Sequence, residues 1–513
     1  MAKRFDFGGV NLSAGGDDSG SRPQAETPFR IAILGDFSGR INRRLSDVST
    51  VGKRRPIEVD RDNFDGVLSR FGVELNLPLG DGGSLNLHFA DLDDFHPDRI
   101  FERVKAFESL RVLRSRLEDP SSFDEAAREL GLASRNAATV QAPQSVQAPV
   151  IAPSVAELAS GSLLEETVAE TESRAVQRQP SGSPDVVRDF AQRVAAQHSQ
   201  STPDPRQPEI LAVMDRAIGG LMRAILHNRE FQTLEAGWRA TFFLIRRLET
   251  NSHLKVYLID ISKAELAADL SSANDLRDTG VYQLLVESSV ETPGAEPWAM
   301  IVGNYRFGDQ SEDAASLAKV AQIARRAGAP FIAEGSSDLL GCTALESGSH
   351  SRDQKEVPNW WAELRHSPEA EYLALALPRF LLRLPYGKKT SPLESFDFEE
   401  FSDPPAHEDY LWGSPAFAVA LLLGQSFSES GWQMRPGSLA EIDRLPLYLH
   451  MRHGESQAKP CAEVLLTEDL VEEMIEAGLM PLVSFKDRDL VRVARFQSIA
   501  DPPRTLAGPW QAA

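Results

Sequence analysis

The sequence predicts a mixed α/β protein in which β-sheets are flanked by helices. In the first 130 residues, short apolar segments such as "FRIAIL" (residues 29–34) alternate with amphipathic helical patterns. Further along, "WAMIVGNYRF", "AASLAKVAQIARRAG" and "PFIAEG" form a strand, helix and strand run that is compatible with a parallel crossover. A stretch rich in Pro, Ala and Gln separates the two parts, so we expect two folded regions joined by a long linker.

Length and composition limit the classes of protein. A chain of 513 residues with 42% hydrophobic and 25% charged residues should bury a large core in two or three domains. The net charge of -21 argues against nucleic-acid binding, and no apolar run is long enough to insert into a membrane. The N-terminus has a basic start without an apolar signal segment. Cys342 and Cys461 could be free thiols or one bridge; free thiols are favoured and fit the cytoplasm.

The first region, residues 1–130, contains several expected elements. After the strand at 29–34, "PIEVD" suggests a shorter one, and "NFDGVLSRF" predicts a helix with Asp62 or Asn63 as its cap. "VELNLPL" and "SLNLHFADL" flank "GDGG" and predict a β-hairpin. A longer helix is expected to start at Pro97 and to continue through Leu117, because its apolar residues recur at spacings of three and four.

The remaining chain divides into a join and a second region. Residues 131–208 form the linker, with short helical patterns such as "SLLEETVAETESRAV" inside it. Residues 209–513 begin with two amphipathic helices, "ILAVMDRAIGGLMRAIL" and "EFQTLEAGWRATFFLIRRLE", followed by the strand "LKVYLID". Ser262 and Glu265 have the spacing of a capping box at the start of the next helix.

The loop "RIAILGDFSGR", residues 30–40, has some features of a phosphate-binding loop. Only three residues separate Gly35 from Gly39, where a P-loop needs four. Arg40 replaces the lysine, Ile41 replaces the hydroxyl residue, and Asp36 would place a carboxylate against the phosphate. We therefore interpret this stretch as a core strand followed by a turn.

Other patterns do not complete a reaction centre. "VDRDNFDG" lacks the glycine and the glutamate of a calcium loop, so Asp60 and Asp62 indicate a helix start. The acidic "DLDDF" precedes the helix at Pro97, where carboxylates favour the positive helix end. His450 and His453 would be half of a zinc site without a second pair. With no nucleophile signature either, we expect no catalytic residue, no metal, no cofactor and no enzymatic activity.

Two arginines stand out in "LPRFLLRLPYG". Arg379 and Arg383 lie four residues apart among leucines. Such arginines usually pack by their stems and pair with carboxylates, which the nearby "ESFDFEEF" could supply, so we interpret them as structural. The alternative is an oxyanion clamp for an enzyme that acts on an anionic substrate.

Many stretches in order resemble a known family. "FRIAILGDFSGR", "IEVDRDNFDGVL" and "LDDFHPDRIFERVKAFESLRVLRSRL" resemble the small subunit of the type VI secretion contractile sheath. "ILHNREFQTLEAGWRATFFLI", "LKVYLIDISKAEL", "IVGNYRF", "GAPFIAE", "EYLALALPRFLLRLPYG", "DYLWGSPAFAVA" and "FQSIADP" resemble the large subunit. The resemblance covers most of residues 28–118 and 209–503. The chain therefore resembles a small sheath subunit fused to a large subunit that is truncated at its C-terminus.

The resemblance implies a fold and a set of partners. It implies one intertwined protomer that polymerises in the bacterial cytoplasm, with itself or with other sheath subunits, around an inner tube whose expulsion delivers effectors. The segment at Arg4, Phe5, Asp6 and Phe7 is placed like a strand that pairs with a neighbouring protomer. Leu163, Leu164 and Glu165 are placed like a helix that a recycling AAA+ ATPase recognises. The inner tube protein and the baseplate are further implied partners.

One departure from the family leaves a second hypothesis open. Large subunits continue beyond the "FQSIADP" region, whereas this chain ends at Ala513. A homologue that does not polymerise, and instead caps the lattice, binds the baseplate or regulates assembly, would also fit the sequence.

Overall fold

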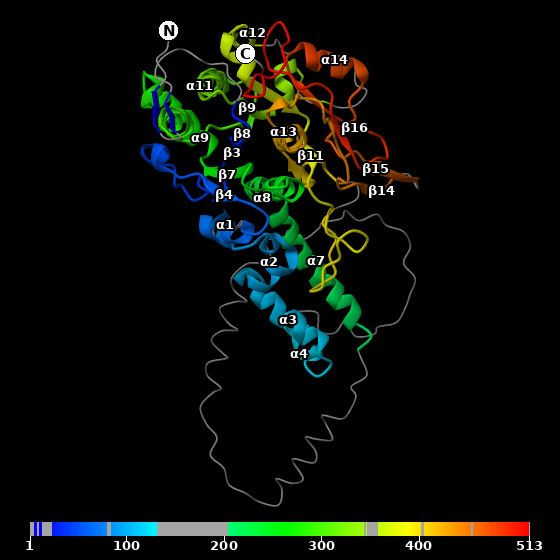
Figure 1. The fold of residues 1–513 in the computed structure, drawn as a ribbon. Coiled ribbons are helices and arrows are strands. Elements are labelled where there is room, and N and C mark those ends of the chain that lie inside the picture. Colours follow the sequence, from blue (N-terminus) through cyan, green and yellow to red (C-terminus); the bar gives the residue numbers. More distant parts are fainter. Residues whose placement is uncertain are drawn as a thin grey trace, which may run out of the picture.

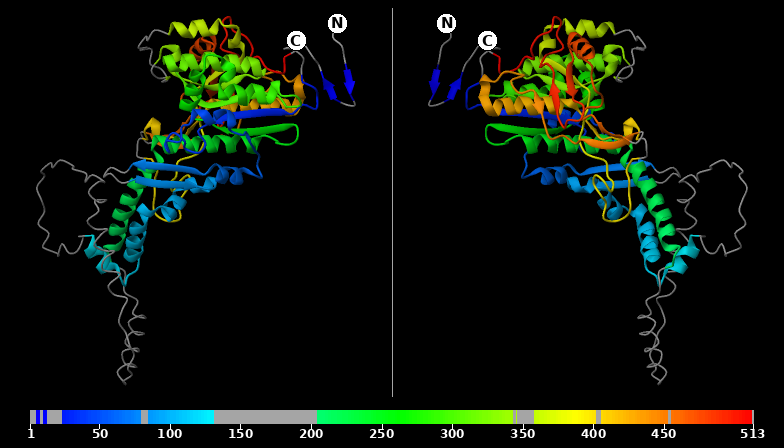
Figure 2. Two further views of the ribbon diagram at one scale, coloured as in Figure 1. Left: turned by 90° about the vertical axis from the view of Figure 1, so that its left-hand side faces the viewer. Right: turned by 90° about the vertical axis from the view of Figure 1, so that its right-hand side faces the viewer.

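The computed structural model describes residues 23–78, 84–130, 204–342, 345, 358–401, 405–452 and 455–511, with the backbone of two short strands at 5–7 and 10–12. These residues form an α/β body from which a helical arm extends (Figures 1 and 2). Both regions of the sequence contribute to the body.

A nine-stranded mixed sheet forms the centre of the body. Six neighbouring strands are parallel, and antiparallel strands complete both ends. The order across the sheet is β13 (Glu441–Ile442), β17 (Val491–Val493), β16 (Met480–Ser484), β10 (Leu373–Leu377), β9 (Phe331–Gly335), β8 (Met300–Phe307), β3 (Phe29–Gly35), β7 (Leu254–Asp260) and β4 (Ile57–Val59).

Strand β3 lies inside the sheet although it comes from the first region. It pairs in parallel with β7 along its full length and with β8 on its other side. Its apolar run suits a strand that is covered on both faces. Because β3 separates two strands of the second region, the first region does not form a separate sheet there.

Helices cover both faces of the sheet. Phe29, Ile31 and Ile33 of β3 pack in one hydrophobic core with α8 (Arg229–Arg247) and α13 (Pro415–Ser430). The alternate residues Ala32 and Leu34 pack in a second core with α9 (Lys263–Ser272) and α11 (Ser311–Ala327). Because α13 is apolar on all sides, it is suited to a position that is buried all round.

The arm consists of helices from both regions. It contains α3 (Glu108–Glu118), α4 (Phe123–Glu129) and α7 (Gln207–Leu226), which lie together below the body in Figure 1. The Gln207 side chain donates hydrogen bonds to the Leu117 and Glu118 carbonyls at the end of α3, and Arg114 Nε lies 2.8 Å from Asp215 Oδ1. The described chain therefore stops at 130 and resumes at 204 in the same part of the molecule.

The remaining elements attach to this framework. Of these, β5 pairs with β6, β11 with β12, and β14 with β15, each as a two-stranded antiparallel sheet. The bounds are α1 (Phe64–Phe71), β5 (Val73–Pro78), β6 (Ser84–Phe89), α2 (Pro97–Arg103), α10 (Gly280–Tyr282), α12 (Asn359–Arg365), β11 (Phe380–Leu381), β12 (Trp412–Gly413), β14 (Tyr448–Arg452), β15 (Glu455–Lys459) and α14 (Glu468–Glu476).

Several local predictions are confirmed. The hairpin β5–β6, the parallel crossover from β8 through α11 to β9, and the strand at 254–260 are present. Ser262 and Glu265 form the expected capping box of α9. Cys342 and Cys461, both in the described part of the chain, do not form a disulfide bond with each other.

Other local predictions are wrong. The helix expected from Pro97 to Leu117 is interrupted at Val104, whose extended backbone separates α2 from α3. Buried Val104 and Phe107 keep the helical spacing across the break, so the pattern could not reveal it. Asn63 occupies the cap position of α1, but its side chain does not bond the helix. Asp91 caps a short 3-10 turn before α2, and the side chain that caps α2 itself is His96, which was not predicted.

Candidate functional site

The turn after β3 binds a carboxylate of the protein itself. Asp260, at the end of β7, accepts hydrogen bonds from Phe37 N at 2.8 Å, Ser38 N at 3.2 Å and Ser38 Oγ at 2.7 Å. Gly39 has a φ of 76°, and a Cβ there would meet the Glu74 carbonyl at 2.4 Å. The backbone amides that could have held a phosphate are therefore occupied, which agrees with the prediction of a strand and a turn.

A buried ion cluster, the junction cluster, joins the two regions beside this turn. We define it as Arg40 and Arg54 of the first region with Glu265 of the second. Glu265, whose side chain is 0% exposed, lies 3.0 Å from Arg40 Nε and 2.6 Å from Arg54 Nη2. Burial acts to raise the pKa of Glu265, but hydrogen bonds from Arg54 and Arg40 outweigh it and lower the pKa to about 2.

A second buried cluster surrounds Arg383. We define this strap cluster as Arg383 with Glu235 of α8 and Glu400, both of which have 0% exposed side chains. Arg383 Nε donates to Glu235 at 2.9 Å, and its Nη atoms donate to Glu400 at 2.7 and 2.9 Å. Burial would lower the pKa of Arg383, but the two carboxylates raise it well above its ordinary value. Burial likewise opposes ionisation of Glu400, yet Arg383 lowers its pKa to about 2.

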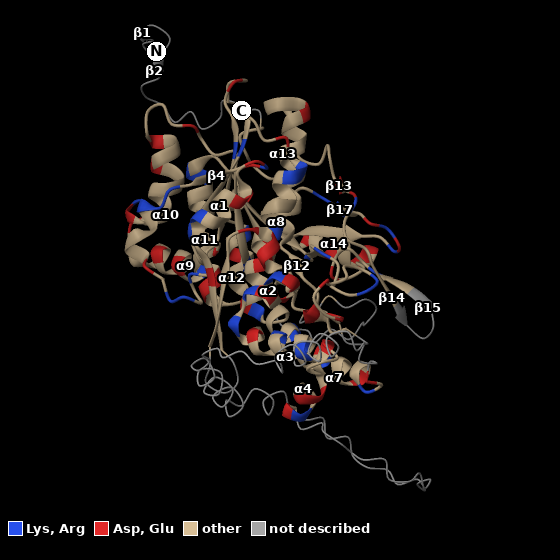
Figure 3. Ribbon diagram, turned by 90° about the horizontal axis from the view of Figure 1, so that it is seen from below, with Lys and Arg blue, Asp and Glu red and all other residues tan. Residues whose placement is uncertain are grey.

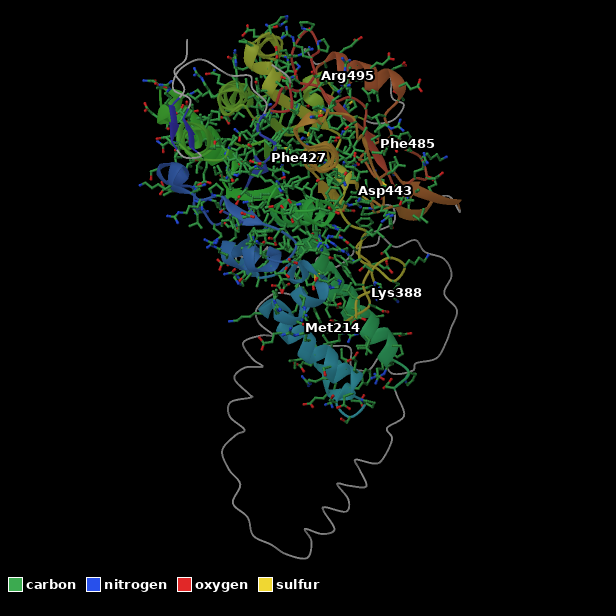
Figure 4. The ribbon with its side chains drawn as sticks, viewed as in Figure 1. Met214, Lys388, Phe427, Asp443, Phe485 and Arg495 are labelled. Atoms are coloured by element: carbon green, nitrogen blue, oxygen red, sulfur yellow. The ribbon has the colours of Figure 1, made fainter. Side chains whose placement is uncertain are left out.

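The strap cluster anchors a segment that connects the body to the arm. This strap, residues 383–401, runs beside α7 in Figure 1, and Figure 4 labels Lys388 on it. Arg223 of α7 donates to the Glu399 carbonyl at 2.9 Å, and Asp98 accepts from the Glu394 amide at 3.1 Å. The strap therefore contacts both regions of the sequence.

Arg379 also binds carboxylates. Its backbone N–H and its Nε both donate to Glu463 at 2.9 Å, and His407 Nε2 lies 3.1 Å from the same side chain. Burial opposes the ionised form of Glu463, but His407 and Arg379 lower its pKa to about 2. Glu334 on β9 lies 3.8 Å from Arg379; burial raises its pKa to about 7.

The structure thus separates the two arginines that the sequence grouped. Arg383 pairs with Glu400 of the "ESFDFEEF" stretch, as the sequence suggested, and also with Glu235, 148 residues upstream. Arg379 pairs instead with Glu463, 84 residues downstream. These distant carboxylates carry no local signal that sequence reasoning could have used. With their guanidinium groups bonded to carboxylates, the two arginines do not converge on a shared site.

The N-terminal segment forms a strand where one was expected, and this strand is part of a hairpin within the chain. Phe5–Phe7 forms β1, which pairs antiparallel with β2 (Val10–Leu12) of the same chain, and Figure 2 shows this hairpin away from the body. The two residues between the strands are Gly8 and Gly9, a sequence typical of a tight hairpin turn, which the prediction of a strand at 4–7 did not include. Some of the residues named in the sequence analysis lie outside the described part of the chain: Arg4, His453 and the stretch Leu163, Leu164 and Glu165.

The described part of the chain bears on three other functional classes: metal binding, membrane insertion and nucleic-acid binding. It contains no group of three or more side chains placed to hold a metal ion. None of the helices described there is long and apolar enough to cross a bilayer. Figure 3 shows Lys and Arg interleaved with Asp and Glu on the described elements, without one continuous basic face.

Comparison with known proteins gives two family matches, which cover different parts of the chain. Residues 208–500, more than half of the chain, match the VipB family, described as EvpB/VC_A0108, tail sheath N-terminal domain. Residues 10–128 match the family described as Type VI secretion system, VipA, VC_A0107 or Hcp2.

Two relatives from Pseudomonas aeruginosa agree with these matches. The type VI secretion system sheath protein TssC1 is 31% identical over 304 residues, which are 57% of this chain and 61% of the relative. The sheath protein TssB1 is 29% identical over 104 residues, or 19% of this chain and 59% of the relative. The chain therefore spans about three-fifths of the length of each relative.

Proposed function

We propose that this chain, which belongs to the VipB family of tail sheath proteins and carries a VipA-like segment before that domain, is a structural subunit of a type VI secretion contractile sheath. In this organisation, residues 1–130 act as the small subunit, 131–208 as the join and 209–513 as the large subunit. Its partners would be other copies of itself or separate sheath subunits.

The observation that carries the proposal is the place of β3. A strand of the VipA-like segment lies between β7 and β8 of the VipB-like domain, and the junction cluster links the same two segments. One chain therefore builds a single protomer from both sheath segments. A fused chain fixes their ratio at one to one and gives each a high effective concentration for the other.

Lattice contacts are proposed to use strand pairing. A two-stranded hairpin such as β1–β2 has two outer edges, and strand addition supplies directional main-chain hydrogen bonds between copies. The segment from Arg4 to Phe7 remains our proposal for one such contact. The stretch Leu163, Leu164 and Glu165 remains the proposed recognition site of a recycling ATPase, and the inner tube and the baseplate remain proposed neighbours.

We further propose a cytoplasmic protein with no catalytic role. The guanidinium groups that could have bound an anionic substrate are instead bonded to Glu463, Glu235 and Glu400. A structural subunit needs no reaction centre.

Negative-stain electron microscopy tests the proposal. The purified chain is imaged alone and after mixing with full-length TssB1 and TssC1. We expect tubes of the chain alone or its incorporation into mixed tubes, detected by a label on the chain. Binding to tube ends without incorporation would favour a capping or regulatory homologue. A chain that stays monomeric and binds no tube would contradict both the role as a sheath subunit and the role as a capping or regulatory homologue.

A further inference from the structure

Some exposed strand edges in this protein are covered by side chains that imitate a neighbouring strand. An edge strand presents free N–H and C=O groups, and copies of a protein can join through them. Two side chains, Asn42 and Asn63, each form two hydrogen bonds to main-chain groups at or beside such edges.

Asn42 covers the outer edge of β5 together with the turn before it, whose Ser38 carbonyl accepts from the Glu74 N–H at 3.5 Å. The Asn42 amide donates to the Asn76 carbonyl at 2.9 Å, and its carbonyl accepts from the Asn76 N–H at 2.7 Å. A neighbouring antiparallel strand would form this same pair of bonds. Glu230 of α8 accepts a hydrogen bond from the Asn42 amide at 2.6 Å and helps to hold it in place.

Asn63 covers main-chain groups at the outer edge of β4, the strand at one end of the nine-stranded sheet. Its amide donates to the Glu58 carbonyl at 3.3 Å, and its carbonyl accepts from the Asp60 N–H at 3.0 Å. Because Glu58 and Asp60 are two residues apart, these groups point to the same side of the strand. Pro56, two residues earlier, has no N–H to offer on that side.

We infer that Asn42 and Asn63 are edge-closing residues, which help to keep β5 and the β4 end of the nine-stranded sheet from adding an extended strand of a second copy. Strand pairing between copies is thereby restricted to other segments. This inference does not depend on the proposed function, because any concentrated solution of the chain brings identical edges together.

The test uses N42A, N63A and the double variant in the full-length chain. N86A is the matched control, because Asn86 lies opposite Asn76 in the same hairpin but bonds no strand edge in the described structure. Light scattering over a range of concentrations measures the mean mass, and hydrogen exchange on dilute protein measures the amides of Asn76 and Asp60. Thermal melts fix a temperature at which every variant is folded.

We expect the mean mass of the double variant to rise severalfold with concentration, relative to wild type and N86A. We also expect the Asn76 and Asp60 amides to exchange severalfold faster in dilute variant protein. A double variant that keeps the wild-type mass at every concentration would overturn the inference, as would equal association of N86A. Tube formation by wild type is scored separately, so failure of the proposed function would leave this result unaffected.

Discussion

The junction cluster and the strap cluster use the same chemistry in different places. Both place buried glutamates against arginines, and both hold a glutamate pKa at about 2. In the junction cluster the two arginines belong to the VipA-like segment and Glu265 belongs to the VipB-like domain. In the strap cluster all three residues follow the join. The first therefore links the two segments, whereas the second fixes a segment to its own domain.

Removing Glu265 should have the largest effect. Glu265→Ala leaves Arg40 and Arg54 without their shared buried partner, so we expect a loss of about 3–5 kcal/mol in the free energy of unfolding. Urea denaturation measures this loss. Glu74→Ala breaks the partly exposed pair with Arg43 and should cost less than about 1 kcal/mol. Equal losses of unfolding free energy in the two variants would contradict the conclusion that the junction cluster stabilises the fold more than a surface ion pair does.

Acid should weaken both clusters. The folded-state pKa values of Glu265 and Glu400 lie near 2, below their ordinary value of 4.5. Each group therefore contributes stability that is present above the unfolded pKa and is lost as the pH falls from about 5 towards 2. The free energy of unfolding should fall by about 3 kcal/mol for each of the two glutamates. Urea midpoints measured across this pH window check it, and a flat profile would contradict the assignment.

Removing Glu400 should have a smaller and more local effect. In Glu400→Ala, Arg383 keeps Glu235 as a partner, so we expect a loss of about 2 kcal/mol. Amide exchange should increase in the strap and remain unchanged in β3, because the strap cluster does not hold that strand. Faster exchange throughout β3 would show that the two clusters are not separable.

Glu334 should show the opposite dependence on pH. Its folded-state pKa of about 7 lies above the unfolded value, so the unfolded chain loses this proton first and stability falls as the pH rises from about 4.5 to 7. Glu334→Gln should gain about 3 kcal/mol over wild type at pH 8 and nothing near pH 4. A variant that is less stable than wild type at pH 8 would show that the charged form is favoured.

Local features were predictable from the sequence because local patterns determine them. The apolar run at 29–34 predicted a buried strand, and the Ser262 and Glu265 spacing predicted a cap. The break at Val104 was missed because buried residues keep the same spacing on both sides of it. The N-terminal hairpin was missed although Gly8 and Gly9 are a known turn signal.

Long-range features could not be predicted from such patterns. The position of β3 between β7 and β8 joins residues more than 200 positions apart, and only the family resemblance implied that the segments intertwine. The partners of Arg379 and Arg383 likewise include Glu463 and Glu235 from distant elements. Spacing along the chain indicates which residues need a partner, whereas the topology decides which partner they meet.

We infer that the two sheath segments form one protomer through contacts other than the peptide join. A protease experiment tests this: a specific site is placed between residues 131 and 203, the folded protein is cut, and the products are measured by size exclusion without denaturant. We predict that both pieces elute together, in equal amounts, at the volume of the uncut chain. Pieces that separate into two independently folded species would contradict the claim.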